Sequence, residues 1–197
     1  LLVVIPNSVM RDKTDEEIAA MVQSGDLESF SFLVERYEKK LKRYARKFLA
    51  NPEDINDIAQ EVFIKAYVNI KSFDIEKKFS PWIYRITHNE LVNSLKKKEK
   101  NPLLFFDADT LFPHPVSKEE TDRKTQADEI KKVLDKCLNQ VSFKYREPLL
   151  LFYMEELSYN EIAEIMRVPV STVGVRLKRG KRMLKKICDK LKLNYEG

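Results

Sequence analysis

Residues 158–184, SYNEIAEIMRVPVSTVGVRLKRGKRML, predict a short helix, a tight turn and a second helix rich in cations. Ser158 and Glu161 form a Ser-x-x-Glu capping box, which satisfies free amide donors at a helix start. The segment Arg167-Val168-Pro169 ends this helix, because proline lacks an amide hydrogen and disfavours helix just before it. Ser171 is the expected N-cap of the second helix. This order is the plan of a helix-turn-helix, whose second helix enters the major groove of DNA.

The expected second helix separates apolar from cationic positions. Its apolar residues recur at the spacing of one helix face, which we expect to contact a core: Val173, Leu177, Gly180, Leu184, Ile187 and Leu191. Residues 171–192 contain nine Lys or Arg and one acid, Asp189, a net charge of +8. A run of charge is most often a solvated helix face. Because this run follows a capped helix and a proline turn, we favour duplex DNA as its ligand.

Length and composition restrict the fold class. The chain has 197 residues, only four glycines and a net charge of +5. Helical periodicity dominates, so we expect an all-α protein with one or two domains. Cys137 and Cys188 fall on apolar helix positions, and we expect them to be reduced core residues of a cytosolic protein. His88 and His114 have no cysteine at ligand spacing, so neither a metal nor another cofactor is expected.

Two helical domains are expected, at 12–98 and 126–193. Apolar periodicity places four helices in the first, at about 14–23, 30–48, 52–71 and 80–98, and two more helices in the second before the helix-turn-helix, at about 130–141 and 148–156. Residues 99–125 contain three prolines and no sustained periodicity, and residues 101–129 hold seven acids against three bases. We therefore interpret 99–125 as a flexible acidic linker. The apolar stretch at 1–5 is too short for a signal or membrane-spanning segment.

A polar stripe lies on the helix expected at 52–71. Asp57, Gln60 and Glu61 recur at i, i+3 and i+4, so they share one helix face. Spacing alone leaves open a solvated face, a surface that docks another protein, and a metal or acid–base site. The last is disfavoured because no histidine or third acid joins the two carboxylates.

The helix expected at 80–98 carries a second polar stripe, which ends in a lysine cluster. Its members recur along one face: Arg85, Asn89, Asn93 and Lys96. Trp82 and Tyr84 lie near its start. Amides and cations beside aromatic rings suit a surface that stacks bases, tracks phosphates and reads an unstacked base. The alternative is that the aromatic residues are core and the lysines only solubilise the helix end.

Three motifs occur in a fixed order: DIAQEVFIKAY at 57–67, FSPWIYRITHN at 79–89, and SYNEIAEIM at 158–166 followed by VSTV at 170–173. Together they resemble the bacterial RNA polymerase sigma factors of the extracytoplasmic-function (ECF) group, over about residues 14–192. The resemblance implies a non-enzymatic, cytoplasmic initiation factor that needs no cofactor and does not insert into membranes. Its implied partners are core RNA polymerase and promoter DNA, with an anti-sigma factor as a candidate third partner.

The resemblance gives each stripe a role. The polar stripe at 52–71 matches the docking site for the clamp helices of the polymerase β′ subunit: Asp57, Gln60, Glu61 and Phe63. The following helix matches the surface that binds the melted minus-ten element: Arg85, Asn89, Asn93, Lys96 and Lys97. Asn89 matches the asparagine associated with capture of a flipped base. The basic helix matches the part that binds the minus-thirty-five duplex: Ser171, Thr172, Arg176, Lys178, Arg179 and Arg182.

Three departures from the family pattern limit this transfer. Ser171 stands where family members often have glycine, and Gly174 stands where a polar or basic residue is common. Asn93 occupies a position where aspartate is common. Because Gly174 has no side chain, Arg176, Lys178 and Arg179 are expected to carry most of what the basic helix contacts.

The linker length fits a protein with two separate DNA contacts. Fully extended, 27 residues span roughly 90 Å, whereas a relaxed coil of that length averages about 30 Å. Two DNA sites two helical turns apart are separated by roughly 70 Å. Polymerase is therefore expected to hold the linker extended. The leading alternative is a stand-alone helix-turn-helix repressor or activator, and a third is a metal-dependent nucleic-acid enzyme built on Asp57 and Glu61.

Overall fold

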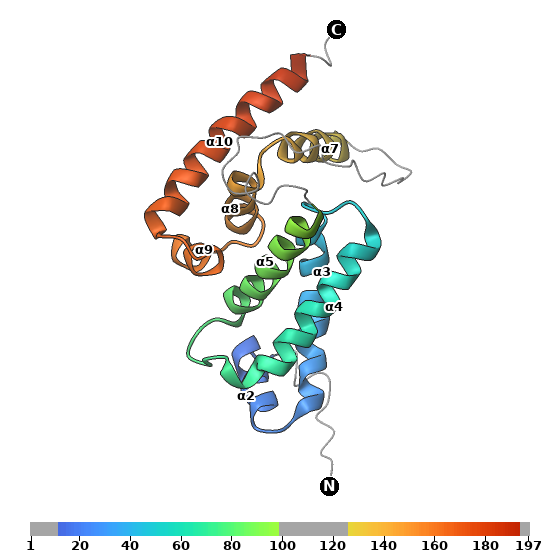
Figure 1. Cartoon of the computed structure of the whole chain (residues 1–197), viewed down its shortest axis with the longest axis vertical. Coiled ribbons are helices and arrows are strands. Elements are labelled where there is room, and N and C mark those ends of the chain that lie inside the picture. The colour runs from blue at the N-terminus through green and yellow to red at the C-terminus, as the bar shows by residue number, and fades with distance from the viewer. Residues whose placement is uncertain (1–11, 99–125, 194–197) are drawn as a thin grey trace.

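The computed structural model describes residues 12–98 and 126–193, so the predicted linker at 99–125 lies outside the described residues. Every regular element within these two ranges is helical (Figure 1), which confirms the all-α class. The α-helices are α2 (Asp15–Gln23), α3 (Phe30–Ala45), α4 (Pro52–Asn69), α5 (Phe79–Lys98), α7 (Gln126–Asn139), α8 (Phe143–Tyr153), α9 (Tyr159–Met166) and α10 (Val170–Leu193). Two short 3-10 turns, Leu27–Ser29 and Ile70–Ser72, complete the first half. None of the described helices is long and apolar enough to cross a membrane.

In the first half, α3, α4 and α5 pack side by side, and α2 packs against α3 and α5. Local sequence explains where these helices begin. The Thr14 hydroxyl accepts a 3.2 Å hydrogen bond from the Glu17 amide, and the Glu17 carboxylate accepts one of 2.7 Å from the Thr14 amide, so the two residues form a capping box at the start of α2. At α4 the Asn51 side chain accepts a 3.0 Å hydrogen bond from the Glu53 amide, and proline stands in the first turn, where its missing amide costs nothing.

The second half ends in the predicted helix-turn-helix, α9 followed by α10. Its capping box is confirmed, with the Ser158 hydroxyl 3.3 Å from the Glu161 amide. Arg167 ends α9 in the left-handed conformation, at φ 51°. The prediction that Ser171 caps α10 is wrong: the helix begins at Val170, and the Pro169 carbonyl already accepts hydrogen bonds from the amides of the next turn. A proline just before a helix can supply this acceptor although it cannot donate.

Helix α8 begins at Phe143 and not at Pro148, which lies inside it. The prediction placed the start at proline because an interior proline removes a hydrogen bond and clashes with the preceding turn. Burial outweighs this cost here, since all but three residues of α8 are buried between the rest of the second half and the first half.

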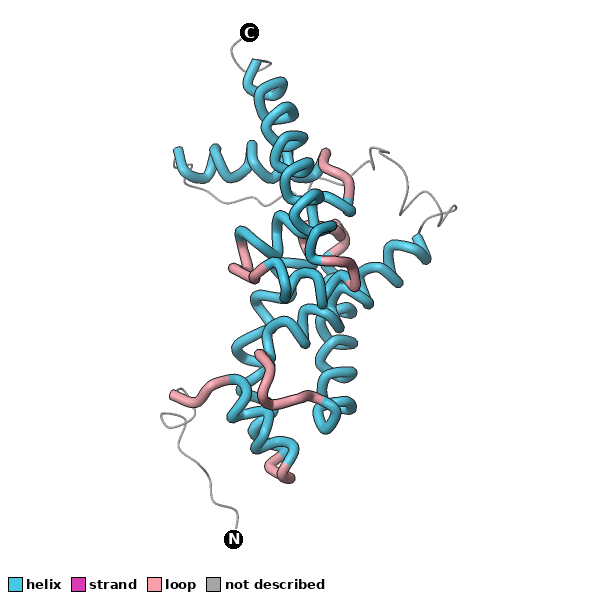
Figure 2. The backbone as a smooth tube through the Cα atoms, turned by 90° about the vertical axis from the view of Figure 1, so that its left-hand side faces the viewer, coloured by secondary structure: helices cyan, strands magenta, loops and turns pink. Residues whose placement is uncertain are grey.

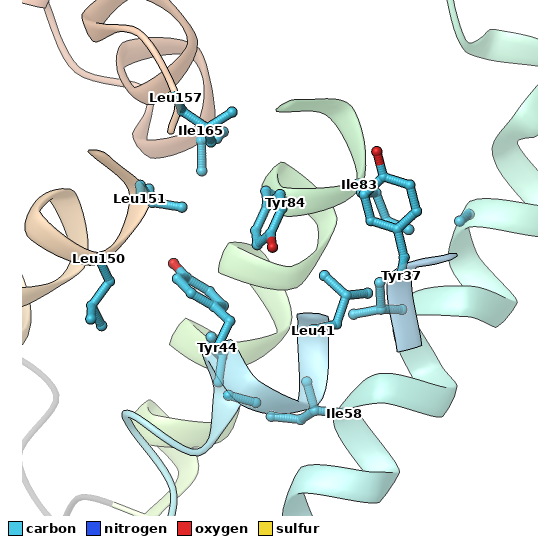
Figure 3. Close-up of a cluster of buried hydrophobic side chains, with 14 of the residues drawn as sticks. Tyr37, Leu41, Tyr44, Ile58, Ile83, Tyr84, Leu150, Leu151, Leu157 and Ile165 are labelled. Carbon is cyan, nitrogen blue, oxygen red and sulfur yellow. The ribbon is translucent and has the colours of Figure 1, made fainter. Parts of the chain in front are cut away.

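The two halves pack against each other, with α5 alongside α9 (Figure 1). The view turned by 90° shows helices throughout the described parts of both halves (Figure 2). Figure 3 shows the continuous core between them, in which Tyr44 lies beside Leu150 and Leu151 and packs edge-on against Tyr84. By contrast, α10 extends beyond the body of the protein (Figure 1). Its apolar stripe is fully buried only at Val173, Leu177 and Gly180, and is half-exposed from Leu184 onward.

The two cysteines do not have the expected reduced form. Cys137 in α7 and Cys188 in α10 are joined by a disulfide, with their Cα atoms 5.5 Å apart. The prediction was right that Cys137 is a core residue, but Cys188 is only half-buried. The pairing arises because α7 packs across the outer part of α10 and brings together positions 51 residues apart. Such a separation carries no pairing signal in the sequence.

Candidate nucleic-acid and protein-docking interface

The polar stripe on α4 is an exposed ridge. Asp57, Gln60 and Glu61 are all exposed, whereas Phe63 is half-buried against the core and therefore does not share their face. The Glu61 carboxylate lies 3.1 Å from Lys65 Nζ, which also lies 2.7 Å from Glu90 of α5. Lys65 thus connects Glu61 to α5 and orients its carboxylate. The two contacts raise the pKa of Lys65, chiefly through the hydrogen bond to Glu90.

The same face of α4 continues into apolar residues. Ile64 and Val68 follow Glu61 by three and seven positions, and their side chains are 50% and 71% exposed. Exposed aliphatic residues beside a row of polar acceptors are typical of a surface that another protein covers. The sequence pattern did not single them out, because isolated apolar residues at the surface are common.

The polar stripe on α5 is divided by its surroundings. Arg85 and Asn89 are half-buried and line a hollow of about 320 Å³, together with Trp82 and, from the end of α9, Arg167. The three remaining members of the predicted set lie further along α5, outside this hollow: Asn93, Lys96 and Lys97. The structure thus brings Arg85 and Asn89 together in a site that faces the second half.

Acidic residues of α9 face the start of this stripe. Glu161 and Glu164 line a hollow of about 380 Å³ whose other walls include Lys78, Trp82 and Arg85. Lys78 Nζ lies 3.1 Å from the Glu161 carboxylate. Burial alone would raise the pKa of Glu161, but hydrogen bonds from Ser158 and Lys78 outweigh it, so that the pKa is lowered. In this arrangement carboxylates of α9 share a hollow with Arg85, at the start of the surface where a nucleic-acid strand was expected.

Further polar contacts join the two halves. The fully buried Glu147 of α8 accepts a 2.7 Å hydrogen bond from the Tyr44 hydroxyl, and its carboxylate lies 2.6 Å from His88 Nδ1. Glu155, which follows α8, accepts hydrogen bonds from Arg43 and Tyr84. Sequence reasoning missed Glu147 and Glu155. The sequence offers one signal, and only for Glu147: a charged Arg-Glu pair within the apolar run at 141–152. This pair does not indicate which residue Glu147 contacts.

Most of the predicted contact residues on α10 are exposed. Ser171, Lys178, Arg179 and Arg182 are exposed, and Thr172 is half-buried. Arg176 differs, because it is half-buried; burial lowers its pKa, an effect that Glu147 and Tyr145 oppose. The structure therefore places Arg176 toward α8 and separates it from the other three cations.

A hollow of about 580 Å³ lies beside the exposed cations of α10. Gly174, Lys178 and Arg182 line it, together with two tyrosines that sequence reasoning missed, Tyr153 and Tyr159. Both tyrosines are exposed large side chains. A concave surface with phenol donors and several cations suits the sugar–phosphate strand of a DNA duplex. A helix-turn-helix with this cationic face defines a DNA-recognition protein.

Comparison with known families narrows this class. The sigma-70 region 2 family model matches residues 33–101, and the sigma-70 region 4 model matches residues 131–184. The ECF sigma factor SigW of Bacillus subtilis is 36% identical over 173 residues, which cover 84% of this chain and 91% of SigW. The ECF sigma-E factor of Haemophilus influenzae is 32% identical, with 87% and 93% covered. The chain belongs to the ECF group of RNA polymerase sigma factors, which are non-enzymatic subunits that direct promoter-specific transcription.

Solved structures share the same fold. CnrH, determined in complex with the cytosolic domain of CnrY, matches with a TM-score of 0.68 at 22% identity, over 90% of this chain and 99% of CnrH. RpoE of Bartonella quintana, determined in complex with the anti-sigma factor NepR, matches with a TM-score of 0.61 at 21% identity, over 81% and 96%. At these identities the likeness establishes the fold alone.

Proposed function

We propose that this sigma factor recognises promoters with two separate domains, 12–98 and 126–193, joined by 99–125. The first domain binds the clamp helices of polymerase β′ through the α4 ridge and traps the melted minus-ten strand on α5. The second binds the minus-thirty-five duplex with α10. The protein acts in the cytoplasm, together with RNA polymerase. The observation that carries this proposal is the presence of two cationic or amide-rich surfaces, each within its own family-matched region.

The minus-ten surface is assigned by its charge and by the kinds of group that converge on it. Asn89 and Arg85 share one hollow with Trp82, so a donor amide, a cation and an aromatic ring converge there. These are the groups that capture an unstacked base and its phosphate. Asn93, Lys96 and Lys97 continue the path along α5 and would follow the strand. The minus-thirty-five surface is assigned by the exposed Lys178, Arg179 and Arg182, with Ser171, Thr172 and the half-buried Arg176 at its margin.

The compact arrangement implies a rearrangement before promoter binding. While α9 covers Arg85 and Asn89, a DNA strand cannot reach them, and the two DNA surfaces cannot be engaged together at promoter spacing. We infer that core polymerase separates the halves and that the 27 residues of 99–125 bridge them. An anti-sigma factor is a further candidate partner, since solved structures of this fold include a complex with one.

The test is in vitro transcription with purified core polymerase and genomic DNA fragments. We expect promoter-specific transcripts, and at least tenfold weaker core binding for Glu61→Ala. The matched control is Glu35→Ala, because Glu35 is also an exposed acid but belongs to α3 and not to the α4 ridge. Absence of specific transcripts would contradict the proposal. Tight binding of operator DNA without polymerase would instead favour a stand-alone repressor or activator.

A further inference from the structure

The disulfide between Cys137 and Cys188 lies away from every surface assigned above. Cys137 of α7 is completely buried, and the half-buried Cys188 lies in the outer part of α10. The exposed cations Arg179 and Arg182 precede Cys188 by nine and six positions, which is about two and a half and one and a half helical turns. Neither promoter recognition nor polymerase docking requires a covalent bond at this position.

The packing of α7 shows what the bond contributes. Ile130 and Leu134 of α7 are 64% and 42% exposed, so these two apolar side chains contribute little to the core. It is held by the buried Leu138, by the ion pair of Asp135 with Lys47 at 2.6 Å, and by the bond to α10. The inner part of α10, by contrast, is anchored on α8 and α9 through its buried residues Val173 and Leu177. The disulfide therefore fastens α7, a helix with few buried residues among those described, to α10.

We propose that Cys137 and Cys188 form a reversible oxidation site, which a hydroperoxide converts to the disulfide and a dithiol reductant restores. The half-buried Cys188 thiol attacks the peroxide oxygen and becomes a sulfenic acid, with release of water or an alcohol. The Cys137 thiol then displaces the sulfenic oxygen as water, and the S–S bond forms. Reduction returns two hydrogens from the dithiol, which becomes a disulfide itself. Disulfides in thiol-reducing compartments are typically transient or redox-sensing, which fits a reversible site.

The consequence is a redox-dependent stability of the DNA-binding half. Linking positions 51 residues apart restricts the unfolded chain, and loops of this size give large stabilisation. For a domain of this size we expect a rise in Tm on the order of 10 °C. Binding of duplex DNA at 25 °C should change less than twofold, because the inner part of α10 is anchored independently of the bond.

The experiment uses the full-length chain, treated with hydrogen peroxide or with dithiothreitol, alkylated under denaturing conditions and analysed by mass spectrometry and thermal unfolding. We expect peroxide to remove two hydrogens, to leave a cross-linked peptide pair containing Cys137 and Cys188, and to raise Tm. Dithiothreitol should reverse all three effects. Cys188→Ser should show no change in Tm between the two treatments; it is preferred to a variant of the buried Cys137, which could impair folding.

Three outcomes would overturn the proposal. Both thiols could remain open to alkylation after peroxide, the cross-link could form between two chains, or it could form within one chain without raising Tm. None of these readouts depends on promoter recognition. The oxidation site and the proposed function can therefore fail separately.

Discussion

The Tyr44 hydroxyl donates a 2.7 Å hydrogen bond to the carboxylate of Glu147, 103 residues further along the chain, and neither side chain is more than 1% exposed. Burial and the nearby Glu147 charge raise the pKa of Tyr44 well above its usual value, so the phenol remains a donor. His88 contacts the same carboxylate from α5. One acid of the second half is therefore held by two helices of the first half, and these contacts add to the apolar core that joins the halves.

Tyr44→Phe should weaken this arrangement. The change keeps the ring but removes one hydrogen-bond donor from a buried carboxylate, a loss that typically costs about 1–3 kcal/mol. Urea unfolding should show this decrease. The control is Tyr67→Phe, because the Tyr67 ring is 40% exposed and loses its hydroxyl where water can replace it. Equal destabilisation by the two changes would contradict the role given to the Tyr44–Glu147 bond.

Glu161 should make stability depend on pH in the acidic range. Its pKa in the folded protein is lowered from the ordinary value of 4.5, because hydrogen bonds from Ser158 and Lys78 outweigh the effect of burial. Its contribution is therefore complete above about pH 4.5 and is lost as the pH falls through the lower folded value. The difference in unfolding free energy between the wild type and Glu161→Gln should shrink over that range.

The control for this titration is Glu164→Gln. Glu164 lines the same hollow, but it belongs to no capping box. Its replacement should leave the pH profile of unfolding close to that of the wild type. A Glu161→Gln profile parallel to the wild type at all pH values would show that the lowered pKa does not support the fold.

The two glycines of α10 should respond in opposite ways to alanine. A Cβ at Gly180 would lie 2.9 Å from the Tyr145 carbonyl oxygen and 3.0 Å from Leu149, so α8 would have to move. A Cβ at Gly174 would meet only Tyr159, at an ordinary 3.6 Å. Gly180→Ala should therefore lower Tm, whereas Gly174→Ala should stabilise α10 by up to about 1 kcal/mol through helix propensity. Similar changes in Tm for both would contradict the close packing of Gly180 on α8.

Local patterns were sufficient to predict most of the helices, and contacts across the chain were not predictable from them. The capping boxes at Thr14 and Ser158 depend on neighbours three residues apart, so the sequence displays both partners. Pro148 was misinterpreted because burial, which the local pattern does not show, compensates an interior proline. Long-range pairs such as Tyr44 with Glu147 leave no periodic signal, and the compact arrangement of the halves was therefore not expected.

In the candidate site, too, local relations were predictable from the sequence and contacts with distant elements were not. Helical spacing correctly placed Asp57, Gln60 and Glu61 on one exposed face, because that relation is set by helix geometry alone. The same spacing places Phe63 on the core side of the helix, where the structure has it. It could not show that Arg176 lies partly buried near Glu147. Burial depends on which element packs against a helix, and for Arg176 that element is distant in sequence.

Arg179→Ala should weaken binding of the promoter by the holoenzyme without destabilising the protein. Arg179 is exposed on α10, and its guanidinium can contact base edges or phosphates in the major groove. Loss of a contact with a base should reduce the binding free energy by about 1–3 kcal/mol and weaken the preference for one base at one position of the minus-thirty-five element. Gel-shift measurements at several salt concentrations distinguish the loss of a base contact from the loss of a phosphate contact. Loss of a phosphate contact weakens binding to all DNA sequences alike and lowers the slope of log affinity against log salt concentration by about one.

The matched control is Lys190→Ala, which removes an exposed cation about three turns further along α10. If both variants lose the same affinity for every promoter, general charge and not α10 side-chain contacts would account for binding.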